Sequence, residues 1–369
     1  MIRNIQIQNF KCFQSVSSFD FAKLNLLTGI NGRGKSSLLQ AILILSQSAW
    51  KDTQLKKLII NDQFVNLGTF SDIKNSETLR GENIHFQVDL PPLCSAKLQY
   101  AENPDAILQA ECTKFDVTPS RKKKFFVESM KKIHFVSADR LGPLKYVDKT
   151  NLPEFIHVGS RGENTINILS HSLTLDNVSD TLYRGKDAKS LLQQTMEWLG
   201  YVLDGAKIDI KGRDDESSVL YMLLNNKNNS YSYKPINVGF GYSYVLPLIV
   251  TGLIAKQGEI IIVENPEAHL HPKAQSRITE FFAKVASCGI QVFIESHSEH
   301  ILNGIRLSAL NPEILLNSTD LSIYYFNEGF NAEKLDMDGQ GKIKNWPNGF
   351  FDQQEIDLAQ IFKYSRMKS

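Results

Sequence analysis

The residues best suited to chemistry form one glycine-rich segment, Gly29-Ile30-Asn31-Gly32-Arg33-Gly34-Lys35-Ser36-Ser37. This segment fits the phosphate-loop pattern G-x-x-x-x-G-K-[ST] at every fixed position. Glycines let backbone N–H groups turn toward phosphate oxygens, and a helix that begins there adds partial positive charge. Lys35 can reach the β- and γ-phosphates of a nucleoside triphosphate, and the Ser36 hydroxyl can ligate Mg²⁺. We therefore expect residues 31–37 to hold the nucleotide.

The elements around this loop are those that such a loop needs. Residues 24–28 are predicted to form a short buried strand before it, and residues 37–58 one long helix after it. Residues 259–264 form an apolar strand that ends in Glu264, and residues 291–295 form another that leads into His297. In parallel α/β sheets, ligands lie at the carboxyl ends of the strands. Glu264 is therefore the expected Mg²⁺ carboxylate, and His297 is expected to face the γ-phosphate.

Together these elements resemble the ABC-type ATPase superfamily, and within it the branch of RecF-like, SMC-like and OLD-family proteins. Further segments carry the likeness along the chain: residues 5–13 resemble the first strand, 61–73 the Q-loop, 237–243 the signature motif, 264–272 the Walker B motif and D-loop, and 296–298 the switch histidine. The sequence Trp346-Pro-Asn-Gly-Phe-Phe-Asp352 resembles a C-terminal module of some prokaryotic ATPases, which often belong to anti-phage or DNA-damage systems.

The resemblance implies ATP and Mg²⁺ as ligands, and a homodimer that encloses ATP between two heads with the signature motif acting in trans. It assigns roles to further residues. The nucleotide-binding set gains Lys11, Gly239, Gly241 and Ser243, the metal set is Ser36, Glu264 and Asn66, and the catalytic set is Glu264, Asn265, Glu267 and His297.

The sequence departs from the family pattern at two places. The general-base position after Glu264 holds Asn265, whose amide cannot accept a proton from water. Hydrolysis is therefore expected to be slow, with Glu267 as the nearest alternative base. In the signature segment, Gly239 stands at the usual serine position and Phe240 at a glycine position, so Ser243 is a candidate substitute.

The predicted fold is α/β: one ABC-type ATPase head over residues 1–369, with a mixed sheet, flanking helices and no long coiled coil. A β-rich antiparallel lobe is expected at about 75–135, a helical and hairpin insertion at about 160–235, and a C-terminal module at 335–369. Residues 225–230 are expected to form a polar turn between two strands.

Composition narrows the class of protein. The net charge is +1, and 42% of the residues are hydrophobic, which is typical of soluble globular proteins. The four cysteines are scattered and resemble reduced thiols. No signal peptide or membrane span is evident, so we expect a cytoplasmic protein without membrane contact.

The first functional hypothesis is an ATP-hydrolysing switch that controls a separately encoded effector, such as a nuclease, in anti-phage defence or DNA metabolism. The alternative is a stand-alone RecF-like ATPase that binds DNA structures. Lys122, Lys123 and Lys124 belong to a basic run that could touch nucleic-acid phosphates, although a solvated loop or β-turn is the commoner outcome. A transporter head and a zinc site at the histidine pairs remain less favoured hypotheses.

Overall fold

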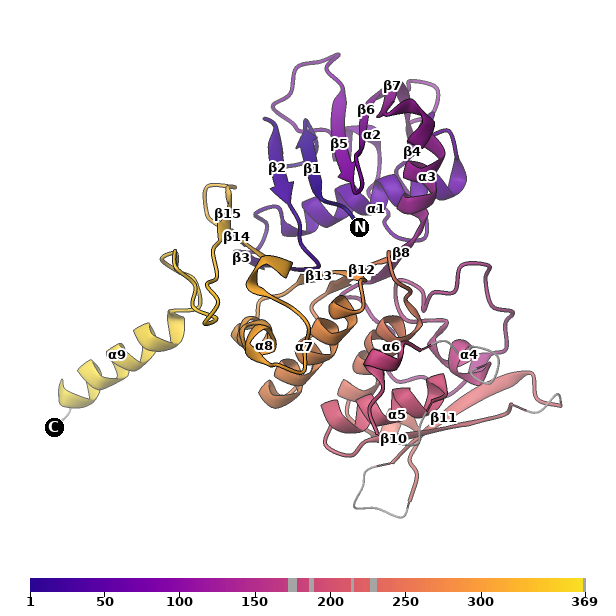
Figure 1. Ribbon diagram of the computed structural model, residues 1–369, viewed down its shortest axis with the longest axis vertical. Coiled ribbons are helices and arrows are strands. Elements are labelled where there is room, and N and C mark those ends of the chain that lie inside the picture. Colours follow the sequence, from indigo (N-terminus) through magenta and orange to yellow (C-terminus); the bar gives the residue numbers. More distant parts are fainter. Residues whose placement is uncertain (172–177, 186–188, 214–215, 226–230, 368–369) are drawn as a thin grey trace.

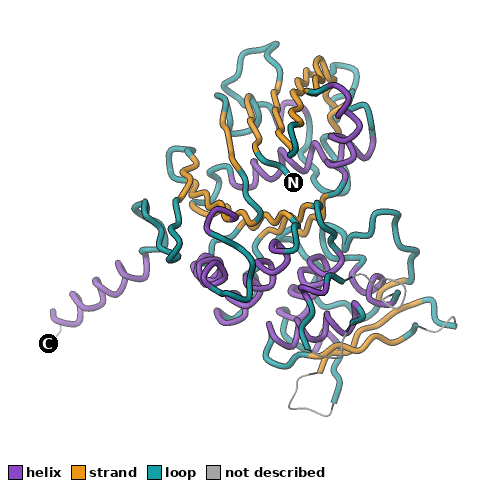
Figure 2. The backbone as a smooth tube through the Cα atoms, in the orientation of Figure 1, coloured by secondary structure: helices purple, strands orange, loops and turns teal. Residues whose placement is uncertain are grey.

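A computed structural model describes residues 1–171, 178–185, 189–213, 216–225 and 231–367. Three layers follow one another in Figure 1: an antiparallel sheet, a central mixed sheet, and a layer of helices. Figure 2 shows the same order, with the orange strands of the two large sheets separated by a long helix and the purple helices beneath the central sheet.

The central sheet has six strands in the order β15-β14-β3-β13-β12-β8. Their bounds are β15 Ala332–Leu335, β14 Leu321–Phe326, β3 Leu24–Gly29, β13 Gln291–Glu295, β12 Ile260–Glu264 and β8 Ile133–Val136. The pairs β14–β3, β3–β13, β13–β12 and β12–β8 are parallel, while β15 is an antiparallel edge strand. The carboxyl ends of β3, β13 and β12 therefore meet at one edge of the sheet.

The continuous apolar runs of these strands have a structural cause. Alternate side chains of β12 enter different cores: Ile261 and Val263 pack with the helices, and Ile260 and Ile262 pack toward the antiparallel sheet. A strand covered on both faces has no polar side to alternate with. Covering helices on the first face are α6 Gly241–Ile254, α7 Pro272–Ser287 and α8 Glu299–Leu310.

The antiparallel sheet is larger than the sequence predicts. Its order is β2-β1-β5-β6-β7-β4, with bounds β2 Ser17–Asp20, β1 Asn4–Gln8, β5 Ile84–Leu90, β6 Cys94–Glu102, β7 Gln109–Thr118 and β4 Lys57–Ile59. The expected lobe at about 75–135 thus supplies only three of the six strands. After β7 the range contains a helix, α3 Lys123–Lys131, and its last residues belong to β8 of the central sheet.

Helix α1, Lys35–Lys51, lies between the two sheets and ends earlier than the predicted residue 58. The side chain of Asp52 explains the end, because its carboxylate accepts the backbone N–H groups of Gln54, Lys56 and Lys57. These bonds turn the chain into β4. The 17 residues of α1 make it the longest described helix, in agreement with the expected absence of a long coiled coil.

Smaller elements complete the described chain. They are α2 Phe70–Ile73, β9 Val147–Asp148, α4 Thr165–Ser170, α5 Leu191–Val202, β10 Lys207–Lys211, β11 Val219–Asn225 and α9 Gln353–Met367. Strands β10 and β11 pair in antiparallel fashion, but residues 226–230 of the predicted polar turn lie outside the described residues. Helix α9 extends away from the body in Figure 1, and every one of its residues is exposed.

Candidate nucleotide-binding site

The phosphate loop leaves β3 through a glycine that no other residue can replace. Gly29 has φ +119°, and a Cβ there would lie 2.3 Å from the carbonyl oxygen of Phe326 on the neighbouring strand β14. Gly34 has φ +110° and precedes α1, whose first turn contains no acidic residue. The N-terminal amides of α1 are therefore directed at the space where phosphates would bind.

Lys35 is folded back onto this loop. Its ammonium donates to the carbonyl oxygens of Gly29 and Ile30 at 3.0 and 2.7 Å. Burial lowers the pKa of Lys35, and the nearby Glu295 opposes that effect. These two carbonyl oxygens hold the ammonium at the loop, and the ammonium can exchange them for phosphate oxygens.

A cavity of about 310 Å³ joins the loop to the ends of β12 and β13. Its loop side is formed by Asn31, Gly32, Gly34, Lys35, Ser36 and Ser37. The opposite side consists of Ala138, Glu264, Asn265, Glu295 and His297. This volume lies within the range of small-ligand sites. The structure thus brings most of the sequence-predicted residues together at one place.

Glu295 is the carboxylate that the sequence analysis missed. Glu264 and Glu295 are register partners on adjacent parallel strands, so both end at the cavity. The hydroxyl of Ser36 donates to Oε1 of Glu295 at 2.8 Å, whereas Oε2 of Glu264 accepts from the backbone N–H of Ala138 at 3.1 Å. The glutamate nearest to the Ser36 hydroxyl is therefore Glu295.

Burial at this site disfavours the charged form of both carboxylates. Burial raises the pKa of Glu264, and burial together with the charge of Glu264 raises the pKa of Glu295 to about 7. Oε2 of Glu295 is buried and has no hydrogen-bond partner among the described residues. One hydroxyl and two carboxylates, one of which has a buried oxygen without a partner, form a donor set that suits Mg²⁺, which prefers oxygen ligands.

The positions expected to handle water follow Glu264 and Glu295 closely in the chain. Asn265 has φ +44°, a left-handed conformation that asparagine tolerates better than most residues. Oε1 of Glu267 accepts the backbone N–H of His297 at 2.9 Å, and its Oε2 is a second buried oxygen without a partner in the described chain. Burial and the nearby Lys35 lower the pKa of His297, so a neutral ring faces the cavity at pH 7.

Arg140 supports this backbone from behind, a role that the sequence did not assign to it. Its side chain is only 2% exposed and donates to the carbonyl oxygens of Glu264 and Asn265 at 2.9 and 2.6 Å. The guanidinium also lies 5.2 Å from the ring centre of Tyr244 on α6. Burial lowers the pKa of Arg140 to about 10, so it stays charged near neutral pH.

The remaining predicted residues lie outside the 310 Å³ cavity. Lys11 donates to the Gln40 side chain at 2.5 Å. Asn66 is exposed, and its backbone forms an isolated antiparallel β-bridge with Asn61. The signature residues Gly239, Gly241 and Ser243 lie just before and at the start of α6, and none of them borders the cavity. Arg33 instead stacks on Phe330, at 4.6 Å.

Comparisons with known proteins assign most of the chain to one family. Residues 1–134 and 121–302 match the family described as AAA ATPase domain, and residues 316–361 match a family described as protein of unknown function (DUF3696). The second match begins before the predicted module boundary at residue 335. In the part of the chain that the structure describes, no helix is long and apolar enough to cross a membrane.

Individual relatives match shorter stretches. The chain is 27% identical over 111 residues to an OLD nuclease of Thermus scotoductus, which is 25% of this chain and 20% of that protein. It is 38% identical over 68 residues to the DNA replication and repair protein RecF of Francisella tularensis, 17% of this chain and 19% of the relative. The chain thus spans about a fifth of the length of these relatives.

Solved structures agree in fold over nearly the whole chain. An Smc head domain with an extended coiled coil, derived from Pyrococcus furiosus and bound to the C-terminal domain of ScpA, superposes with a TM-score of 0.51 at 11% identity. That match covers 98% of this chain and 99% of the other. The expected α/β head fold and the resemblance stated above are confirmed. The chain belongs to the AAA ATPase domain family, and it is similar in sequence to OLD nuclease and RecF over part of its length and in fold to an Smc head domain.

Proposed function

We propose that this ATPase is a slow switch, in which two heads close on ATP and the closed state controls a separate effector. One observation carries the proposal: the signature residues Gly239, Gly241 and Ser243 belong to the head but border no part of the 310 Å³ cavity. One chain therefore leaves the outer side of the phosphates without ligands. A second copy can supply them from the start of its own α6.

In this proposal Lys35 and the loop amides bind the β- and γ-phosphates. Ser36, Glu264 and Glu295 would hold Mg²⁺, which when bound supplies positive charge to the phosphate oxygens. Asn265 can orient a water molecule but cannot remove its proton. Glu267 is the candidate base, since its unpartnered Oε2 is buried beside His297. The missing base at residue 265 supports slow turnover and a long-lived closed state.

A complementation experiment tests the shared site. Lys35→Ala disables the loop, and Gly239→Arg places a bulky cation at a position where a Cβ has no neighbour within 4 Å, so it spares the fold. Each variant alone is expected to be inactive. In an equal mixture, half the dimers are mixed and each contains one intact site, so about a quarter of the wild-type ATPase rate should return. No recovery on mixing would mean that each chain works alone.

Support for a role in DNA metabolism comes from the names of the relatives, a nuclease and a DNA replication and repair protein. We place the effector, a nuclease in an anti-phage or DNA-damage system, on a partner chain. The test uses the proteins encoded beside this one. Their co-purification with the wild-type chain in the presence of ATP is compared with their co-purification with Lys35→Ala, also in the presence of ATP. Equal recovery in both samples would remove ATP control from the proposal.

The alternative is a head that itself binds DNA structures. A DNA-binding assay over a range of salt concentrations separates the two, because phosphate contacts weaken steeply with salt. Tight DNA binding that depends on ATP in the absence of any partner would favour this alternative.

A further inference from the structure

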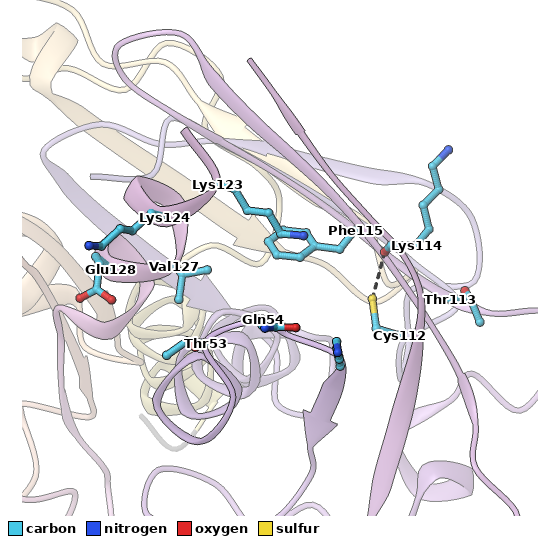
Figure 3. A pocket seen from close by; sticks show the side chains of 11 residues that line it. Thr53, Gln54, Cys112, Thr113, Lys114, Phe115, Lys123, Lys124, Val127 and Glu128 are labelled. Atoms are coloured by element: carbon cyan, nitrogen blue, oxygen red, sulfur yellow. Dashed lines mark hydrogen bonds between the residues drawn. The ribbon is translucent and has the colours of Figure 1, made fainter. Parts of the chain in front are cut away.

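A cavity larger than the nucleotide site belongs to the antiparallel lobe. It has a volume of about 680 Å³ and lies between α3, β7 and the turn that joins α1 to β4 (Figure 3). It shares no residue with the 310 Å³ cavity of the phosphate loop. The following inference therefore stands independently of the dimeric switch.

Four lysines border this cavity: Lys56, Lys114, Lys123 and Lys124. Glu128 is its one acidic residue, and that carboxylate is bound by Lys131 at 2.9 Å, outside the cavity. Lys114 is paired with Asp116. Within the described chain the other three lysines form no ion pair, so the cavity keeps uncompensated positive charge.

The start of α3 adds to this charge. Its first two residues are Lys123 and Lys124, Lys122 occupies the N-cap position without a capping hydrogen bond, and no acidic residue occupies the first turn. Stable helices place carboxylates at this end, because the unpaired amides there already carry partial positive charge. Three lysines at that end raise the local potential further. Such an arrangement, unfavourable for the helix by itself, is what a bound anion would relieve.

The cavity also has a shaped wall. The ammonium of Lys123 lies 4.2 Å from the ring centre of Phe115, so its side chain reaches from α3 toward β7 (Figure 3). The ring of Phe115 packs in turn against Phe126 of α3, at 5.9 Å. Lys123 is thus held over the cavity by an aromatic surface. Thr53, Gln54 and Thr113 add neutral polar groups around it.

We propose that this cavity binds a phosphate-bearing ligand, either a free polyphosphate such as a nucleotide or the 5′-phosphate at the end of a nucleic-acid strand. Ammonium groups from α3 and from Lys56 surround the phosphates in this proposal. A concave site admits a terminal phosphate or a small molecule more readily than it admits the middle of a duplex.

Binding is measured with tripolyphosphate by calorimetry, and with 5′-phosphorylated and 5′-hydroxyl oligonucleotides by fluorescence anisotropy. The parent chain is Lys35→Ala, which removes the contribution of the phosphate loop. Adding Lys123→Gln and Lys124→Gln should weaken binding at least tenfold. The control replaces two exposed strand lysines away from the cavity, Lys97→Gln and Lys207→Gln. Equal losses in the two double variants, or no binding by the parent, would overturn the proposal.

The two sources of phosphate give different results. Preference for the 5′-phosphorylated over the 5′-hydroxyl oligonucleotide identifies a strand end. Binding of tripolyphosphate without that preference identifies a small ligand. Separately, the Lys123→Gln and Lys124→Gln substitutions in the otherwise wild-type chain should leave the basal ATPase rate unchanged, which verifies the fold.

Cys112 reports the location of the ligand, because its half-buried thiol borders the cavity. Tripolyphosphate should slow the alkylation of Cys112, measured by peptide mass spectrometry, and leave Cys288 on the opposite side of the central sheet unaffected. The protection should disappear in the Lys123→Gln, Lys124→Gln variant. Protection of Cys288 to the same degree, or none of Cys112, would place the phosphate elsewhere and refute the assignment.

Discussion

Replacing Glu295 with glutamine tests the electrostatics of the nucleotide site without any ligand. The side chain is 6% exposed, and burial with the nearby Glu264 raises its pKa from 4.5 to about 7. A carboxyl group whose pKa is higher in the folded than in the unfolded protein stabilises the fold fully at pH values below its unfolded pKa. This contribution to the unfolding free energy is lost as the pH rises through the folded pKa. Between pH 5 and pH 8 the loss amounts to about 2.5 kcal/mol for a shift of this size.

Glutamine keeps the shape of the side chain and an oxygen that can accept from Ser36, but it does not titrate. The free energy of unfolding is measured with urea, in the presence of EDTA, at pH 5 and at pH 8. From pH 5 to pH 8, the value for Glu295→Gln relative to wild type should rise by about 2.5 kcal/mol. Glu111→Gln, an exposed change on β7, controls for the loss of one negative charge. Parallel pH dependence of wild type and Glu295→Gln would refute the reasoning.

The same variant separates stability from metal binding. If Glu295 and Ser36 share Mg²⁺, Glu295→Gln should lose most of the enhancement of ATP affinity by Mg²⁺ in calorimetry while it gains stability. An unchanged enhancement would leave Glu264 as the sole carboxylate for the metal.

Further predictions concern the loop, the water position and the arginine behind it. Lys35→Ala should abolish ATP binding in calorimetry, because no other loop cation reaches the γ-phosphate; unchanged affinity would contradict the site. Asn265→Glu should speed phosphate release by up to about 10²-fold if a base is what is missing, while the left-handed backbone costs the variant about 1–2 kcal/mol in unfolding free energy. Arg140→Lys cannot bridge the carbonyls of Glu264 and Asn265, so urea unfolding should show a loss of about 1.5–3 kcal/mol; a loss below 0.5 kcal/mol would mean that the bonds contribute little.

Local sequence was sufficient to predict the phosphate loop and the strand that ends in Glu264. Both depend on contiguous residues, and the pattern of each is set within a dozen positions. Glu295 was missed although it stands two residues before His297. Its role depends on the register of β13 beside β12 and on its distance from Ser36, and periodicity carries no information on either.

The basic run at Lys122–Lys124 shows a different limit. A basic run most often forms a solvated loop or β-turn, yet α3 begins at Lys123, although lysines at a helix start conflict with the helix dipole. Its apolar face, Phe126, Val127 and Met130, is buried in the lobe core and outweighs the unfavourable charge. Tertiary packing decides such cases, and the conflict that remains marks the place where an anion would be accommodated.

The signature segment and the water position are mechanically connected within one chain. Tyr244 of α6 contacts the ring of His269 at 4.6 Å and lies over Arg140, which holds the carbonyls of Glu264 and Asn265. A Cβ on Gly241 would lie 3.1 Å from the carbonyl oxygen of His269, so glycine at this position lets the start of α6 lie close to the D-loop. In the proposed dimer, a nucleotide held by the partner would press on the start of α6. The displacement would reach the backbone of Asn265 through Tyr244 and Arg140, so each site would sense whether the other is filled.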